Sequence, residues 1–365
     1  MTEGHRTRKG KNYGSERVLY TDAETGARIV QLTSFPTIGM NLYFEQCSFT
    51  ADSQRLIFYS QRAADRDAPF DVFRADVDGT NLVRLTDRDD VGGLVLAPKA
   101  AKAFFSAGSE VRSVDLETFK EETLAHFEGF HSFASSLGGI SSDEGNYYAY
   151  LHREEERYAL VRVATDGKGG EVLYEGFNLT HVNVDPKTGT VAFGERAPDE
   201  TKNWLMNPDG SNLRRFTFEK FAHCSWWGQT GAWQGCYLPP DRGICIYREG
   251  GEKEEVIVSG SRYFWHSGSS PDGEWIVADT NWPDEGIFLV HVPSKRSGLV
   301  CRSRSSNGHP QWTHPHPSIS PDGNYVLFNS DRPGISQVHL ATIPEGLKER
   351  LVKGDVTVRD RTLCV

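Results

Sequence analysis

Short runs of alternating apolar and polar positions recur along the whole chain, and long helical periodicity is nearly absent. Examples are RLIFYS (55–60), TVAFGE (190–195), EWIVADT (274–280) and YVLFNS (325–330). β-branched and aromatic residues dominate these runs, as is typical of strands. The pattern therefore predicts an all-β protein built from many short strands.

The turns between these runs repeat at a regular spacing. The clearest copies are Ser-Pro-Asp-Gly at 270–273 and 320–323, and degenerate copies occur at 50–53, 97–99, 142–145, 185–188 and 228–231. The third turn position falls at residues 52, 99, 143, 187, 230, 272 and 322, which are 42 to 50 residues apart. Such a period is typical of a β-propeller, so seven turns predict seven blades. Two stacked β-sandwiches are the alternative, but they would not explain seven similar repeats.

The last repeat ends one strand short, after QVHLATI (337–343). The N-terminal segment ARIVQLT (27–33) has the character of the outer strands, so we expect it to supply the missing strand and close the ring. This predicts a single propeller domain over residues 17–345. Polar tails are expected at 1–16 and 346–365.

Composition narrows the class of protein. The chain has 365 residues with 40 Lys+Arg and 50 Asp+Glu, a net charge of −10, which argues against a general nucleic-acid binder. No run of 18 or more apolar residues occurs and the N-terminus lacks an apolar core, so neither a membrane span nor a secretory signal is expected. Six widely spaced cysteines without a CxxC pair favour free thiols and the cytoplasm.

The repeat predicts which residues line the central channel. The first strand of each blade borders the channel, so residues at one fixed distance before each turn should lie at the same level. Counting back six positions gives Gln46, Gly93, Leu137, His181, His266 and His316. In the fifth repeat the count gives Cys224, or His223 when the turn position is taken as residue 229. His314 should share the channel face with His316, because residues i and i+2 of a strand point the same way. A single histidine is more often packed in a core than a ligand. Several neutral imidazoles at one level predict a divalent-metal site.

The strongest local motif is QWTHPHP (311–317). Prolines 315 and 317 suit a stiff innermost edge strand. Gln311 offers a neutral amide oxygen from the segment that enters this strand. Imidazoles and an amide leave the charge of a divalent ion uncancelled and are compatible with Mn, Fe, Co, Ni or Zn, so such a site favours an anionic ligand. The chain has no GxSxG, P-loop, GxGxxG or HExxH motif.

These residues resemble a known family. QWTHPHPSISPDGNYVLFNSD (311–331) is similar to the C-terminal signature of the oligogalacturonate lyases, the cytoplasmic pectin-degrading propellers of polysaccharide lyase family 22. Weaker similarity covers NLYFEQCSFTADSQRLIF (41–58) and the fourth repeat (190–215). HCSWW (223–227) and WHSGSSPDG (265–273) stand where that family has its two other active-site histidines.

The resemblance implies a metal-dependent β-elimination of short oligogalacturonides. It implies metal ligands at His266, Gln311, His314 and His316, with manganese as the usual ion. It also implies that His223 is the base that removes the C5 proton of the uronate. Lys202 stands where the family typically has an arginine, and it loses the planar fork that grips a carboxylate. Lys202 is expected beside His223 among the catalytic residues, and Lys202, His181 and Gln46 are the expected substrate contacts.

Two alternatives remain open from the sequence. The substitution at Lys202 would fit a lyase acting on a different uronide. A non-catalytic TolB-like propeller scaffold would share the turns but needs no cluster of histidines on the axis. In the leading interpretation the partner is a short acidic oligosaccharide, and no nucleic acid, membrane or protein partner is expected.

Overall fold

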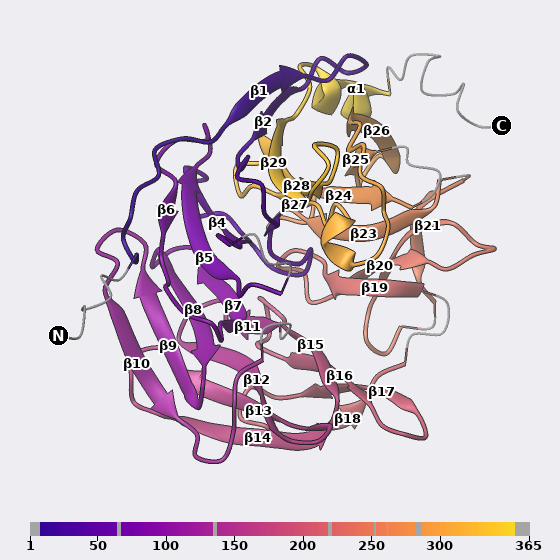
Figure 1. Cartoon of the computed structure of the whole chain (residues 1–365). Coiled ribbons are helices and arrows are strands. Elements are labelled where there is room, and N and C mark those ends of the chain that lie inside the picture. The colour runs from indigo at the N-terminus through magenta and orange to yellow at the C-terminus, as the bar shows by residue number, and fades with distance from the viewer. Residues whose placement is uncertain are drawn as a thin grey trace.

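The computed structural model shows a ring of antiparallel sheets arranged around a central axis (Figure 1). It describes residues 8–63, 67–133, 137–217, 221–251, 253–260, 262–281 and 286–354. Within these ranges the strands form seven sheets, six with four strands and one with five. This confirms the seven-bladed β-propeller predicted from the turn spacing.

Blades 1 to 3 follow one another along the chain. Blade 1 comprises β3 (Gly39–Met40), β4 (Arg55–Ser60), β5 (Asp71–Asp76) and β6 (Val83–Arg84); blade 2 comprises β7 (Gly92–Ala97), β8 (Lys102–Ala107), β9 (Glu110–Asp115) and β10 (Glu121–His126). Blade 3 comprises β11 (Gly138–Ile140), β12 (Asn146–Glu154), β13 (Arg157–Ala164) and β14 (Gly170–Phe177). In each blade the first strand in sequence is the innermost.

Blades 4 to 6 repeat the same order. Blade 4 comprises β15 (Leu179–Val184), β16 (Val191–Arg196), β17 (Thr201–Met206) and β18 (Arg214–Arg215); blade 5 comprises β19 (Phe221–Trp226), β20 (Trp233–Tyr237), β21 (Gly243–Tyr247) and β22 (Glu255–Ser259). Blade 6 comprises β23 (Phe264–Ser269), β24 (Trp275–Thr280), β25 (Ile287–His291) and β26 (Arg296–Cys301).

Blade 7 joins the two ends of the chain. Its strands are β27 (Ser318–Ile319), β28 (Tyr325–Ser330) and β29 (Gln337–Thr342), followed by β2 (Arg28–Gln31) and β1 (Val18–Thr21). The predicted closing strand is β2, which pairs antiparallel with β29. The sequence interpretation did not foresee β1, which adds a fifth strand at the outer edge.

The repeated turn is stabilised by its own side chains. In the turn after β23, the Ser270 hydroxyl accepts a hydrogen bond from the backbone N–H of Trp275, at 3.0 Å. The Asp272 carboxylate accepts the N–H of Glu274 at 2.9 Å, and Gly273 adopts the left-handed φ of 73° that this turn requires. The same chemistry recurs in the turn after β27, which explains the repeating sequence signal.

Apolar side chains fill the gaps between neighbouring blades. Each of the seven gaps holds at least one apolar cluster of buried side chains. Between blades 1 and 2, for example, Ile57 packs in the same cluster as Phe105, and both are fully buried. Each such side chain contributes about 1.5–3 kcal/mol of burial free energy, so the blades are held mainly by their flat faces.

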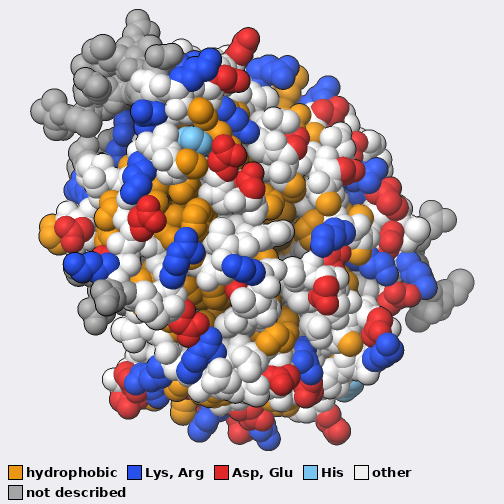
Figure 2. Space-filling view, turned by 180° about the vertical axis from the view of Figure 1, so that it is seen from behind, with side chains coloured by type: hydrophobic (Ala, Val, Ile, Leu, Met, Phe, Trp, Pro, Cys, Tyr) orange, Lys and Arg blue, Asp and Glu red, His pale blue; other side chains and the backbone are white. Residues whose placement is uncertain are grey.

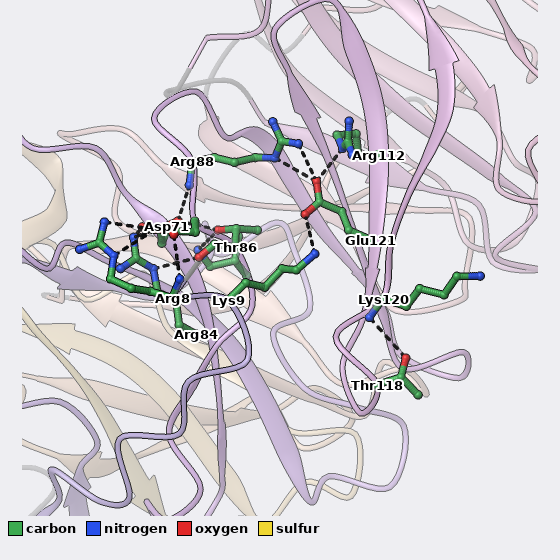
Figure 3. Close-up of polar contacts among 12 residues, drawn as sticks. Arg8, Lys9, Asp71, Arg84, Thr86, Arg88, Arg112, Thr118, Lys120 and Glu121 are labelled. Carbon is green, nitrogen blue, oxygen red and sulfur yellow. Dashed lines mark hydrogen bonds and ion pairs between the residues drawn. The ribbon is translucent and has the colours of Figure 1, made fainter. Parts of the chain in front are cut away.

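The described parts of the two predicted tails pack on the propeller. Near the N-terminus, Tyr13 donates its N–H to Leu82 in blade 1, and Lys9 pairs with Glu121 in blade 2 at 3.3 Å (Figure 3). Near the C-terminus, helix α1 (Leu347–Lys353) buries Leu347 against blades 6 and 7. The packed part of the described chain therefore extends beyond the predicted limits of 17 and 345. Residues 1–7 and 355–365 lie outside the described chain.

Charges are mixed on the surface seen from the side opposite to Figure 1. Lys and Arg side chains alternate with Asp and Glu side chains across this face (Figure 2). It therefore carries no broad field of one sign. Within the described ranges, no helix is both long and apolar enough to cross a membrane.

Candidate functional site

β-Bulges turn histidine side chains toward the channel. The pairing register shifts around His181 in β15 and around His223 in β19. Both residues have left-handed backbones, with φ of 58° and 52°. His316, just before β27, has φ of 45°. An extra residue in an inner strand re-aims its side chain, so these bulges point imidazoles into the channel.

Three imidazoles from two blades come together on the axis. The ring of His266 lies 4.3 Å from the ring of His316 and 5.6 Å from that of His314. One nitrogen atom of each ring lies within 4.8 Å of the other two, which is close enough for one shared ion. His266 is fully buried and His316 is 5% exposed. The structure therefore brings together three of the four predicted ligands.

The hydrogen bonds of these histidines leave one nitrogen of each ring available. His266 donates Nδ1–H to the Asp279 carboxylate at 2.9 Å, and His314 donates Nε2–H to the carbonyl of Gly308 at 2.9 Å. In the described chain, the buried His266 Nε2, His314 Nδ1 and His316 Nε2 atoms have no hydrogen-bond partner. Burial holds the pKa of His266 and His316 well below the usual value, so both rings are neutral. Three converging lone pairs fit a divalent metal ion.

Asp279 orients two of these histidines, and sequence reasoning missed it. It lies on β24, 1% exposed, and also accepts the backbone N–H groups of His266 at 2.7 Å and of His316 at 3.2 Å. Burial raises the pKa of Asp279 to about 6, although the neighbouring histidines oppose that shift. A carboxylate behind a metal-binding imidazole fixes its tautomer and orientation. The available signal was one acidic residue inside the apolar run WIVADT (275–280).

His223 lies beside the three ligands without joining them. Its ring is 4.7 Å from that of His266 and 4.3 Å from that of Trp265. Burial lowers the pKa of His223 to about 4, and its buried Nδ1 has no hydrogen-bond partner in the described chain. His223 and His181 both line a cavity of about 310 Å³ at the start of the inner strands. A neutral imidazole is therefore held where a bound ligand could contact it.

His181 is paired with Glu45, which sequence reasoning did not single out. His181 Nδ1 lies 3.1 Å from Glu45 Oε1, and the Glu45 side chain is only 5% exposed. Burial lowers the pKa of His181, but the carboxylate outweighs it and raises that pKa above the usual value. Tyr43 packs between the two groups of histidines, 5.7 Å from the His181 ring and 4.6 Å from the His316 ring.

Gln46 is engaged in structural contacts. Its amide nitrogen donates to the carbonyls of Leu94, at 3.0 Å, and Gly138, at 2.8 Å, which ties blade 1 to blades 2 and 3. It lines a second cavity of about 370 Å³ at the opposite ends of the inner strands. Its expected contact with the substrate stays a prediction; the preceding residue, Glu45, borders both cavities.

Lys202 points away from His223. In the sheet, Lys202 is paired with Glu195, whose side chain accepts a hydrogen bond from Tyr174 of blade 3 at 3.0 Å. The Lys202 ammonium forms an ion pair with Glu200 at 3.3 Å. Side chains alternate across a strand, so Lys202 lies on the face toward blade 3. This corrects its expected placement.

Arg196 lies on the other face of the same blade. It alternates with Ala192 on β16, and Ala192 packs against Trp226 and Trp233 of blade 5. Arg196 is exposed and has no ion-pair partner among the described residues. The positive charge of Arg196 lowers the pKa of His181, with a smaller effect than burial or Glu45. The sequence offered no signal that would separate Arg196 from other surface arginines.

Gln311 lies on the short 3-10 helix η1 (Gln311–Thr313), directly before His314. Its side chain is exposed, and no contact places its amide beside the three imidazoles. The histidines, not the glutamine, thus define the centre of the site. Taken together, the fold and the site define a class of protein: a β-propeller with three histidines on its axis that could share one metal ion, and a fourth histidine beside them.

Comparisons with known proteins agree with this class. No protein-family model matches the chain. Over 381 residues it is 26% identical to the oligogalacturonide lyase of Pectobacterium atrosepticum, covering 90% of this chain and 96% of that protein. It is 25% identical to the oligogalacturonate lyase of Dickeya dadantii, covering 93% and 99%. A solved oligogalacturonate lyase in complex with manganese is 26% identical and superposes with a TM-score of 0.77, covering 93% of this chain and 99% of that one. The predicted resemblance is confirmed.

Proposed function

We propose that this protein is a metal-dependent lyase that cleaves short oligogalacturonides by β-elimination. The observation that carries the proposal is the convergence of three unpartnered imidazole nitrogens beside the cavity that His223 lines. Similarity to oligogalacturonide lyases over nine-tenths of the chain supports the substrate class. Among divalent ions we propose manganese, because the similar solved lyase is a manganese complex.

The residues that would hold the ion are His266, His314 and His316, with Gln311 at the edge of the site. A divalent cation bound there supplies attraction for the uronate carboxylate and stabilises the negative charge that develops next to it. His223 lines the cavity and its Nδ1 has no hydrogen-bond partner in the described chain, so this imidazole is the group that accepts the C5 proton. The C4–O4 bond then breaks and leaves a 4,5-unsaturated uronate.

The substrate also needs cationic contacts beyond the metal. We infer that Arg196 binds a second carboxylate or a hydroxyl of the oligosaccharide, because it lies on the face of β16 that turns toward blade 5. Its planar guanidinium can bind a carboxylate through two hydrogen bonds. Lys202 has the charge but the opposite orientation. His181 lines the same cavity as His223, so we expect it to contact the sugar.

We propose the cytoplasm as the compartment in which the protein works. The five cysteines of the described chain form no disulfide bonds. Free thiols are typical of a reducing compartment. Short oligogalacturonides would be the small acidic fragments available there.

The deciding experiment measures turnover of digalacturonate and trigalacturonate by the absorbance of the conjugated product, with Mn²⁺ and with other divalent ions. We expect the absorbance to rise with Mn²⁺ and to stay flat after chelation. A flat trace on galacturonides with turnover of another uronide would assign a different substrate. A flat trace on every uronide, with no bound metal, would identify a non-catalytic binding propeller.

A further inference from the structure

The Glu45–His181 pair is built like a catalytic dyad, not like a packing contact. Glu45 is 5% exposed and His181 Nδ1 approaches one of its oxygens at 3.1 Å, while Glu45 Oε2 is buried without a hydrogen-bond partner in the described chain. The imidazole itself remains 41% exposed. A buried carboxylate thus holds one nitrogen of an imidazole that lines the cavity.

The contact fixes the proton arrangement of His181. The Glu45 carboxylate accepts, so His181 Nδ1 carries a hydrogen and donates it. A proton on Nε2 is then the one that can be given to a ligand. The negative charge of Glu45 favours the protonated ring, in agreement with the raised pKa of His181. The backbone at His181 is held in the left-handed region, at φ of 58°, which is a strained conformation typical of functional positions.

The reaction needs two proton carriers on different atoms. One base takes the proton from C5, and the oxygen that leaves C4 must gain a proton to depart as a hydroxyl. Among the described residues that line the cavity, the side chains able to exchange protons are Glu45, His181, His223 and Cys224. Burial holds the pKa of the Cys224 thiol well above the usual value, and the Glu45 carboxylate is engaged with His181. His181 therefore remains for the leaving oxygen.

We propose that His181 is the general acid of the elimination and that Glu45 is its positioning residue. The inference rests on the proposed lyase function and deepens it. In the step, His223 takes the C5 proton, and the C5–H electron pair forms the C4=C5 double bond. The C4–O4 bond breaks with its electron pair going to oxygen, and His181 Nε2 gives that oxygen its proton. One imidazole gains a proton and the other loses one, so the charges balance and solvent restores both rings.

The test compares two uronides that differ only in the leaving group at C4. One is digalacturonate, whose sugar oxygen leaves poorly without a proton, and the other carries a nitrophenyl group that departs as a stable phenolate. We expect His181→Asn to lower turnover of digalacturonate by about 100-fold or more and to change the nitrophenyl substrate little. Glu45→Gln should show the same selective loss to a smaller extent. His126→Asn, at an exposed histidine of blade 2, is the matched control and should change neither.

A second readout separates the two histidines. Exchange of the C5 proton with deuterium from the solvent should persist in His181→Asn, because His223 still removes that proton, and should vanish in His223→Ala. His181→Gly relieves the left-handed strain and serves as a second variant if the first folds poorly. Equal losses on both substrates, or loss of exchange with bound metal retained, would overturn the acid role. An inactive wild type on both substrates would instead overturn the proposed function.

Discussion

The inner strands of blades 2 and 5 share a β-bulge, but only the bulge of blade 5 carries a side chain that can take part in a reaction. The register of β7 shifts around Gly93 and that of β19 around His223, and both residues have left-handed φ angles, 60° and 52°. In blade 2 a glycine takes this conformation and adds no side chain. In blade 5 an imidazole occupies it and lines the cavity. The bulge is therefore a property of the fold, and the residue placed in it decides the chemistry.

The comparison also shows where the molecule gives up stability. A left-handed backbone costs a residue other than glycine about 1–2 kcal/mol. His181, His223 and His316 all take this conformation at the site, whereas blade 2 avoids the cost with Gly93. Strain of this kind persists only where the surrounding structure holds it and is typical of functional sites.

The largest expected effect comes from removing a ligand of the shared ion. His266→Ala deletes the most buried of the three imidazoles, so we expect loss of stoichiometric metal and of all measurable turnover. Elemental analysis of the purified protein and the product absorbance check both. Gly93→Ala, at the bulge of blade 2, should keep its metal. Full metal content in His266→Ala would mean that the ion binds elsewhere.

The next effect separates metal binding from proton transfer. His223→Ala should bind metal like the wild type but lose about 10²–10⁴-fold in turnover, the usual contribution of a general base. Isothermal titration with Mn²⁺ and the uronate assay measure the two properties on the same sample. Wild-type turnover in this variant would remove His223 from the mechanism.

A smaller loss of metal affinity is expected when Asp279, which contacts His266, is changed. Asp279→Asn removes the charge that orients His266, so metal affinity should fall by about 10–100-fold. The matched control is Asp272→Asn, in the turn that follows β23, which should leave the affinity unchanged. Equal affinity in the two variants would contradict the orienting role of Asp279.

Arg196 and Lys202 of blade 4 lie on opposite faces of the blade, so their removal should affect substrate binding differently. Arg196→Gln should raise the KM for digalacturonate by about tenfold, as expected for the loss of a charged hydrogen bond. Lys202→Gln should change it little, because that side chain turns toward blade 3. The reverse order, measured by steady-state kinetics, would show that the substrate approaches from the other side of the blade.

The smallest effect concerns the bulges themselves. His223→Gly and His223→Ala remove the same imidazole, but the glycine variant should be more stable by about 1 kcal/mol. Gly93→Ala should lose about the same amount in blade 2. Denaturant unfolding gives both differences. Equal stability of the two His223 variants would mean that the left-handed backbone carries no strain.

The sequence predicted the ring because its signals are local. Alternating runs and Ser-Pro-Asp-Gly turns depend on neighbouring residues, so the seven blades and the closing β2 were found. The count of six positions before each turn also found His181, His266 and His316, and it left His223 or Cys224 open in the fifth repeat. It worked because the register shifts around His181, His223 and His266 occur at equivalent places.

The misplaced and missed residues depend on contacts between blades. Glu45 and Gln46 are adjacent in the sequence, but their contacts differ. Only the folded ring shows that Gln46 bonds to blades 2 and 3, whereas Glu45 contacts His181. Lys202 was expected at the site from the family resemblance, but its pairing with Glu195 places its side chain on the face toward blade 3. Asp279 acts from the second strand of its blade, so counting along the innermost strands could not reach it.

The closing of the ring has a consequence for how the protein is made. The pairs Ile29–Ala341, Val30–Leu340 and Gln31–His339 join a strand translated early to one translated near the end. On the ribosome, β2 must wait without its partner while the blades form one after another. His314 and His316 leave the ribosome just before β29, so a nascent chain should acquire its ion only as the circle is completed.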